Sequence, residues 1–141
     1  TNKHLITLYS SLVHIGTPTF RHKNGMNNFV QNKKPLGWHR GSDGEEYLFG
    51  MNYFNNNNLV ISFSTGFFQI GEEAIINRIF EPYEDYLEGP FPSGKVDKSY
   101  YIETSLNYWL KEYLSISGNL YLSPNTNIIG LAFNLYLQQL F

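Results

Sequence analysis

The sequence predicts an all-β protein whose antiparallel strands run up and down as part of a transmembrane β-barrel. Two features of composition point to this class: aromatic residues make up 17% of the chain, and charged residues make up only 16%. Typical soluble domains carry about 25% charged residues, and aromatic residues favour strands. The third observation is that apolar residues alternate with polar or small ones in long segments. Most of these exceed the length of about 5–6 residues that is usual in globular proteins.

The clearest alternation lies in the last segment, residues 128–140. The apolar residues of one face are Ile129, Leu131, Phe133, Leu135 and Leu137. Asn134 and Tyr136 belong to the opposite face, which is small or polar. Read as a helix, the same apolar residues would scatter around the whole surface, so period two predicts a strand. We expect the apolar face to contact lipid.

Earlier segments repeat this pattern. The further predicted strands are residues 4–15, 45–54, 59–70, 99–110 and 114–123. The first of them has the weakest alternation. Ten residues that rise ~3.3 Å each and are tilted by about 40° cover roughly 25 Å, which matches the apolar band of an outer-membrane barrel.

The connections agree with an up-and-down arrangement. Three are short: Asn55–Asn58, Lys111–Tyr113 and Ser123–Thr126. Two are long, Gly16–Gly44 and Gly71–Lys98. If the last strand ends on the periplasmic side, both long connections fall on the outer side, where such barrels carry their long loops.

Several classes are disfavoured. No apolar run approaches the ~20 residues of a transmembrane helix. Without cysteine there is no thiolate metal site, thiol nucleophile or disulfide, and a net charge of -2 argues against nucleic acid. The four histidines lack metal-ligand spacing, and no catalytic or phosphate-binding motif is present. We therefore predict no enzyme, metal or cofactor. A soluble β-sandwich or small soluble barrel is the alternative fold.

Two stretches, "IGTPTFRHKNG" (Ile15–Gly25) and "KPLGWHRGSDGEEYLFGMNY" (Lys34–Tyr53), carry a resemblance. They resemble the Wzi family of outer-membrane capsule-assembly proteins, with extra residues at Asn27–Lys33 and Trp38 in place of an expected polar residue. The resemblance extends more faintly through "STGFFQIGEE" (Ser64–Glu73). It implies a barrel with more strands than this chain supplies. It also implies attachment of capsular polysaccharide at the outer membrane, by a lectin-like protein that is not an enzyme.

The first long connection gathers cations with an aromatic ring. The candidate glycan-binding residues are Arg21, His22, Lys23, Trp38, His39 and Arg40. Guanidinium forks match the carboxylates of acidic sugars, and an aromatic face stacks on a sugar ring. The alternative is that these residues brace the loop or line the barrel mouth.

The second long connection holds a possible secondary site of acids and tyrosines. Its residues are Glu81, Tyr83, Glu84, Asp85 and Tyr86. Paired carboxylates hydrolyse glycosides in some enzymes, but a solvated acidic face is the plainer interpretation. A short helix is also expected between Glu72 and Ile79, because Glu72 and Glu73 would favour its N-terminus.

We expect residues 1–141 to form a single domain, the C-terminal section of an outer-membrane barrel with about six strands in this chain. Phe141 at the end of an amphipathic strand resembles the signal that the barrel assembly machinery recognises. The expected partners are therefore surface polysaccharide, outer-membrane lipid and that machinery. Two other functions stay open, a passive porin with the polar face toward its channel, and an outer-membrane carbohydrate hydrolase.

Overall fold

The structure of the chain, a computed structural model, describes residues 4–55, 58–82, 89–123 and 128–137. Its elements are β1 (His4–Ile15), the 3-10 helix η1 (Gly25–Asn27), β2 (Val30–Gln31), β3 (Lys34–Pro35), β4 (Gly44–Asn55), β5 (Leu59–Ile70), β6 (Asp97–Lys111), β7 (Leu114–Ser123) and β8 (Ile128–Leu137). The all-β class is confirmed.

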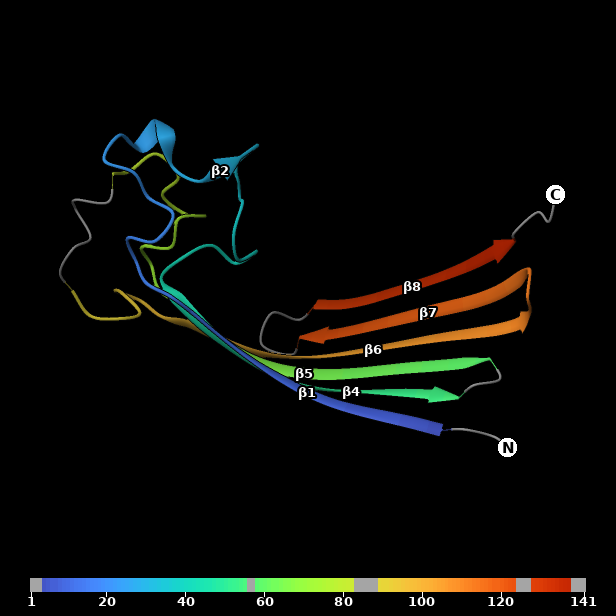
Figure 1. The fold of residues 1–141 in the computed structure, drawn as a ribbon. Coiled ribbons are helices and arrows are strands. Elements are labelled where there is room, and N and C mark those ends of the chain that lie inside the picture. Colours follow the sequence, from blue (N-terminus) through green and yellow to red (C-terminus); the bar gives the residue numbers. More distant parts are fainter. Residues whose placement is uncertain (1–3, 56–57, 83–88, 124–127, 138–141) are drawn as a thin grey trace. The chain divides into compact units, whose positions relative to one another are not determined.

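Six strands form one antiparallel sheet in the order β1-β4-β5-β6-β7-β8, and β2 and β3 form a separate two-stranded sheet (Figure 1). The predicted up-and-down order of the last five long strands is therefore confirmed, and β1 pairs with β4. β6 begins at Asp97, two residues earlier than predicted. Positions 138–140, which we predicted as the end of the last strand, lie outside the described residues.

Two compact units make up the chain, and each is described by itself. The sheet unit comprises Thr1–Ser11, Leu48–Phe67 and Ser99–Phe141. The loop unit comprises Leu12–Tyr47 and Phe68–Lys98. The loop unit thus combines the two long connections with the strand ends that flank them.

The register of β6, β7 and β8 separates an apolar face from a polar one in the sheet unit. Ile116 lies opposite Tyr108 on one side and Leu135 on the other. The next residue, Ser117, lies between Asn107 and Asn134. Because side chains alternate across a strand, rows that are mainly apolar alternate in β6–β8 with rows that are mainly polar or small, and the row of Trp109, Ser115 and Tyr136 is an aromatic exception.

The apolar residues of β8 from Ile129 to Leu135 are exposed, as predicted. The exposed fractions on β8 are 71% for Ile129, 65% for Leu131, 79% for Phe133 and 62% for Leu135. On the other face, Tyr136 is exposed as well, because β8 is an edge strand. Tyr101 is the one buried hydrophobic residue among the described residues of the sheet unit.

Tyr101 closes over a glycine of the neighbouring strand. A Cβ atom at Gly66 would lie 2.5 Å from the Tyr101 ring. That ring also stacks on Tyr121, with centroids 5.8 Å apart, and Thr65 donates a hydrogen bond to the Tyr101 carbonyl over 3.1 Å. An aromatic ring that covers a strand glycine supplies the packing that the glycine lacks.

The short helix expected between Glu72 and Ile79 is wrong. This stretch consists of turns, and no α-helix occurs in the part of the chain that the structure describes. The reason is competition for backbone groups: the Ile75 N–H, which a helix would pair with the Gly71 carbonyl, donates to the Ser42 hydroxyl, and the Glu73 carbonyl accepts from Arg21. None of the described residues forms a helix long and apolar enough to cross a membrane.

Replacing Gly66 by Ala should destabilise the sheet unit by about 1–3 kcal/mol, because Tyr101 is buried and cannot swing clear. Denaturant titration measures the change. Gly118→Ala is the matched control, since its Cβ would meet Phe133 at an ordinary 3.5 Å. Equal stabilities for the two variants would contradict this packing.

Candidate functional site

A buried carboxylate holds the loop unit together. Asp43 has no exposed surface and accepts hydrogen bonds from Thr17 Oγ1 over 2.8 Å, from Ser93 N over 3.0 Å and from Glu73 N over 3.2 Å. The Ser93 hydroxyl donates a fourth bond. Three chain segments that are distant in sequence thus meet on one carboxylate. Charge-assisted bonds of this kind are the stronger ones in proteins.

The neighbours of Asp43 complete this junction. The Ser42 hydroxyl, also fully buried, donates to the Thr17 carbonyl over 3.4 Å and accepts from Ile75 N over 3.1 Å. Gly71 N–H binds the Asp43 carbonyl over 2.8 Å. A side chain at Gly71 would collide with the Asp43 carboxylate and the Ser93 backbone. Only glycine allows the second long connection to approach so closely.

Arg21 links the two long connections through backbone carbonyls. It is 8% exposed, and its guanidinium donates to the carbonyls of Glu73 and Arg78 over 2.7 Å each and of Glu81 over 3.1 Å. Burial lowers the pKa of Arg21, while the charges of Glu81 and Glu73 raise it. The bracing interpretation therefore describes Arg21.

Asn28 also links the first long connection to the second. Its side-chain amide donates to the carbonyls of Ile79 over 2.7 Å and Glu81 over 2.9 Å. Its carbonyl oxygen accepts from His22 N over 2.6 Å. All of its hydrogen-bonding groups are thereby engaged, and the first connection is fastened to the second at another place.

Trp38 and Arg40 come together on one carboxylate, as their shared connection suggested. Trp38 Nε1 donates to Glu46 over 3.0 Å, and Arg40 Nε lies 3.4 Å from the same carboxylate. The Arg40 guanidinium also lies 3.6 Å from the centroid of the buried Phe68 ring. These contacts pack residues 38–40 against β4 and β5. Arg21 contacts a different set of residues, so the structure divides the predicted arginines between two clusters.

The remaining residues of the predicted glycan site are exposed. His22, Lys23 and His39 all present surface to solvent. Partial burial, followed by the charge of Arg40, lowers the pKa of His39, against an opposing effect of Glu46. A lowered pKa leaves the His39 imidazole neutral at pH 7. Lys23 is therefore the cation of this exposed set.

Most of the predicted secondary site lies outside the described residues, namely Tyr83, Glu84, Asp85 and Tyr86. Glu81 is described and pairs with Arg78, with an oxygen 3.4 Å from Nη1. Arg78 also lies 3.3 Å from the Glu73 carboxylate. Among the described residues, no group of three acids or histidines is placed to hold a metal ion.

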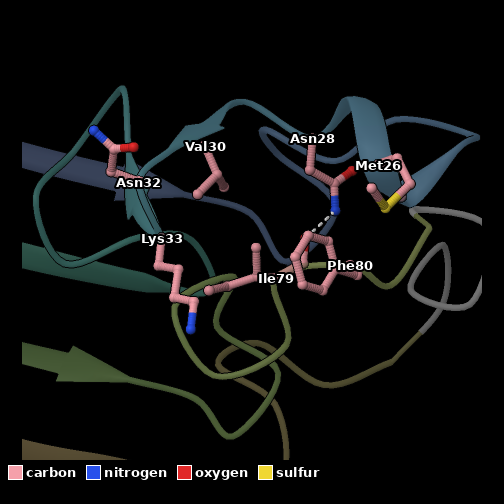
Figure 2. A pocket seen from close by; sticks show the side chains of 8 residues that line it. Met26, Asn28, Val30, Asn32, Lys33, Ile79 and Phe80 are labelled. Atoms are coloured by element: carbon pink, nitrogen blue, oxygen red, sulfur yellow. Dashed lines mark hydrogen bonds between the residues drawn. The ribbon is translucent and has the colours of Figure 1, made fainter.

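A cavity of about 180 Å³ lies in the loop unit (Figure 2). It is lined by Gly25, Met26, Asn28, Val30, Asn32, Lys33, Ile79 and Phe80. Met26 is 74% exposed and Phe80 62%. Figure 2 shows Lys33 at one end of this lining and Phe80 and Met26 toward the other, with Ile79 between them. The lining of the cavity thus combines apolar side chains with one cation, Lys33.

Comparisons of the chain with protein-family models, with curated proteins and with solved structures find no match. The geometry of the two units therefore carries the functional argument.

Sequence reasoning missed the residues of the Asp43 junction and of the cavity. "GSDG" indicated only a turn, because burial of an aspartate depends on segments far along the chain. The hairpin beside the cavity gave only a weak signal, because Asn32 suits the first central position of a tight turn but Lys33 stands where glycine is usual.

Replacing Asp43 by Asn should weaken closure of the loop unit by about 3 kcal/mol, because an amide cannot accept from four donors and would leave some of them buried and unpaired. Amide hydrogen exchange at Glu73 and Ser93 measures this opening. The exposed Asp97 provides the control variant, Asp97→Asn. Unchanged protection in Asp43→Asn would show that the junction does not hold the loops.

Proposed function

We propose that the chain is part of an outer-membrane β-barrel whose loop unit binds surface polysaccharide and retains it at the cell. The observation that carries the membrane part is the exposed apolar face of the sheet unit. Soluble proteins rarely expose apolar areas of this extent, because such areas promote aggregation in water. Where they occur, they mark surfaces that contact a partner or lipid. Lipid is the partner that a long, regular apolar face of strands fits best.

Strand length supports the same placement. β7, which lies wholly in the sheet unit, contains 10 residues. At ~3.3 Å per residue and a tilt of about 40°, ten residues cover roughly 25 Å, enough for the apolar band. Six strands are fewer than the usual minimum of about eight for a closed membrane barrel. In lipid the edges of β1 and β8 must be paired, and the proposal includes further strands that do this.

The loop unit supports the binding part of the proposal. Binding costs less when a surface is ordered beforehand, and Asp43, Arg21 and Asn28 fasten the two long connections to each other. The resemblance to the Wzi family supplies the ligand class, capsular polysaccharide. Repeated weak contacts along a polymer produce retention through multivalency. Lys23, His22, His39 and the Trp38 ring are the proposed contacts.

The membrane placement predicts a difference between neighbouring residues of β8. Leu135→Arg should cost about 2–4 kcal/mol of folding free energy in lipid if the site lies near the bilayer midplane, whereas Asn134→Arg on the polar face should cost less. Urea titrations in lipid vesicles, with heat-modifiable electrophoretic mobility as the readout, compare the two. Equal costs would argue for a soluble sheet.

The polysaccharide role predicts loss of retention without loss of folding. In cells that lack the protein, polysaccharide should shift from the surface to the medium, and the wild-type gene should restore it. The triple variant His22→Ala/Lys23→Ala/His39→Ala should restore it only in part, and added salt should weaken retention because exposed charges are screened. Lys95→Ala, an exposed lysine of the same unit, is the control.

The measurement that tests the polysaccharide role is the amount of surface-bound polysaccharide relative to the amount shed into the medium. Unchanged retention in the deletion strain would remove the polysaccharide role. Solute conductance of the purified protein in planar bilayers, without glycan affinity, would favour a porin instead, and release of free sugar would favour a hydrolase.

A further inference from the structure

The cavity of the loop unit has a lining with distinct parts. Phe80 and Met26 are largely exposed and apolar, and Ile79 and Val30 add further apolar surface. Asn28 belongs to the wall, but its amide groups are engaged by Ile79, Glu81 and His22. Asn28 therefore shapes the cavity and does not offer a bond to a ligand.

Lys33 supplies the charge of the cavity. It is exposed, and among the described residues none forms an ion pair or hydrogen bond with its ammonium group. A cation that pairs with none of the described residues and lies beside an apolar surface is arranged to receive an anion that also has an apolar face. Lys33 and Ile79 both line the cavity and are labelled in Figure 2.

The backbone at Lys33 is unfavourable for a lysine. Gln31 pairs with Lys34, so Asn32 and Lys33 are the two central residues of the β2–β3 hairpin. Their φ angles are 51° and 62°, as a type I′ turn requires. The second position of this turn strongly favours glycine, because a left-handed conformation strains residues with a side chain. Such strain gathers at functional sites, and here it coincides with a residue that lines a cavity.

The size of the cavity limits its ligand. At about 180 Å³ it is smaller than the roughly 300–1,000 Å³ of sites that enclose drug-sized ligands. A single sugar ring suits this volume better than an oligosaccharide. The face of an aromatic ring is electron-rich and attracts the C–H groups on the face of a pyranose ring. An ammonium group binds a carboxylate.

We propose that this cavity is a subsite for one carboxylate-bearing sugar residue, with the Phe80 ring against the sugar face and the Lys33 ammonium on the carboxylate. The subsite deepens the proposed function and rests on it for the polymer to which the sugar belongs. It differs from the glycan site predicted at residues 21–23 and 38–40, since none of those residues lines the cavity.

The first experiment measures the charge contact. Binding of methyl β-glucuronide and of its neutral counterpart, methyl β-glucoside, is followed by calorimetry on the full chain in detergent micelles. Lys33→Gln should weaken glucuronide binding by about ten- to hundredfold, the usual loss for a hydrogen bond between charged groups, and leave glucoside binding unchanged. Lys34→Gln, one residue along and outside the lining, should bind both sugars as wild type does.

The second experiment uses the strain at Lys33. Lys33→Gly should raise the hydrogen-exchange protection of the hairpin, because glycine suits the turn, and should weaken glucuronide binding as much as Lys33→Gln does. If Lys33 instead stabilised the turn, Lys33→Gly would lower the hydrogen-exchange protection of the hairpin. Phe80→Ala should weaken both sugars, whereas Phe29→Ala, which removes another exposed ring of this unit, should weaken neither.

The outcomes separate the subsite from the polysaccharide role. Absence of glucuronide binding by the wild type, or equal effects of Lys33→Gln and Lys34→Gln, overturns the subsite even if the deletion strain sheds its polysaccharide. Glucuronide binding that depends on Lys33, in a protein whose deletion leaves retention unchanged, supports the subsite and removes the capsule role alone.

Discussion

The loop unit depends on one constraint, the need to satisfy the buried carboxylate of Asp43. Four donors from residues 17, 73 and 93 converge on it, and the backbone of Gly71 is drawn close enough to exclude any side chain. A buried carboxylate without these partners would be costly. Asp43 therefore ties the first long connection to the second, and Arg21 and Asn28 add further links between the same two segments.

Different interactions hold the sheet unit together. Hydrophobic burial contributes little there, with Tyr101 as the buried hydrophobic residue among those described. Regular pairing of β6, β7 and β8 and an aromatic ring over Gly66 determine the register. One chain thus combines a loop unit held by buried hydrogen bonds with a sheet whose apolar side chains are exposed. The proposed barrel accounts for the exposed apolar side chains of the sheet unit, since lipid is an apolar solvent.

The strands were predictable because period-two alternation is a local signal. Ile116 and Ser117 are neighbours in sequence, and their opposite characters alone assign them to opposite faces. The loop unit was not predictable in this way. Residue type suggested that Arg21 and Arg40 bind glycans, yet type does not say that the Arg21 guanidinium meets three carbonyls more than fifty residues away along the chain. The expected helix at Glu72–Ile79 failed for the same reason, because the distant Ser42 hydroxyl takes the Ile75 N–H that a helix would pair with the Gly71 carbonyl.

Arg21 and Asn28 bind the opposite connection through main-chain oxygens, at residues 73, 78, 79 and 81. Every amino acid carries such an oxygen. Replacing the side chains at these four positions therefore leaves the acceptors of Arg21 and Asn28 in place, so this link between the two connections tolerates changes of residue type.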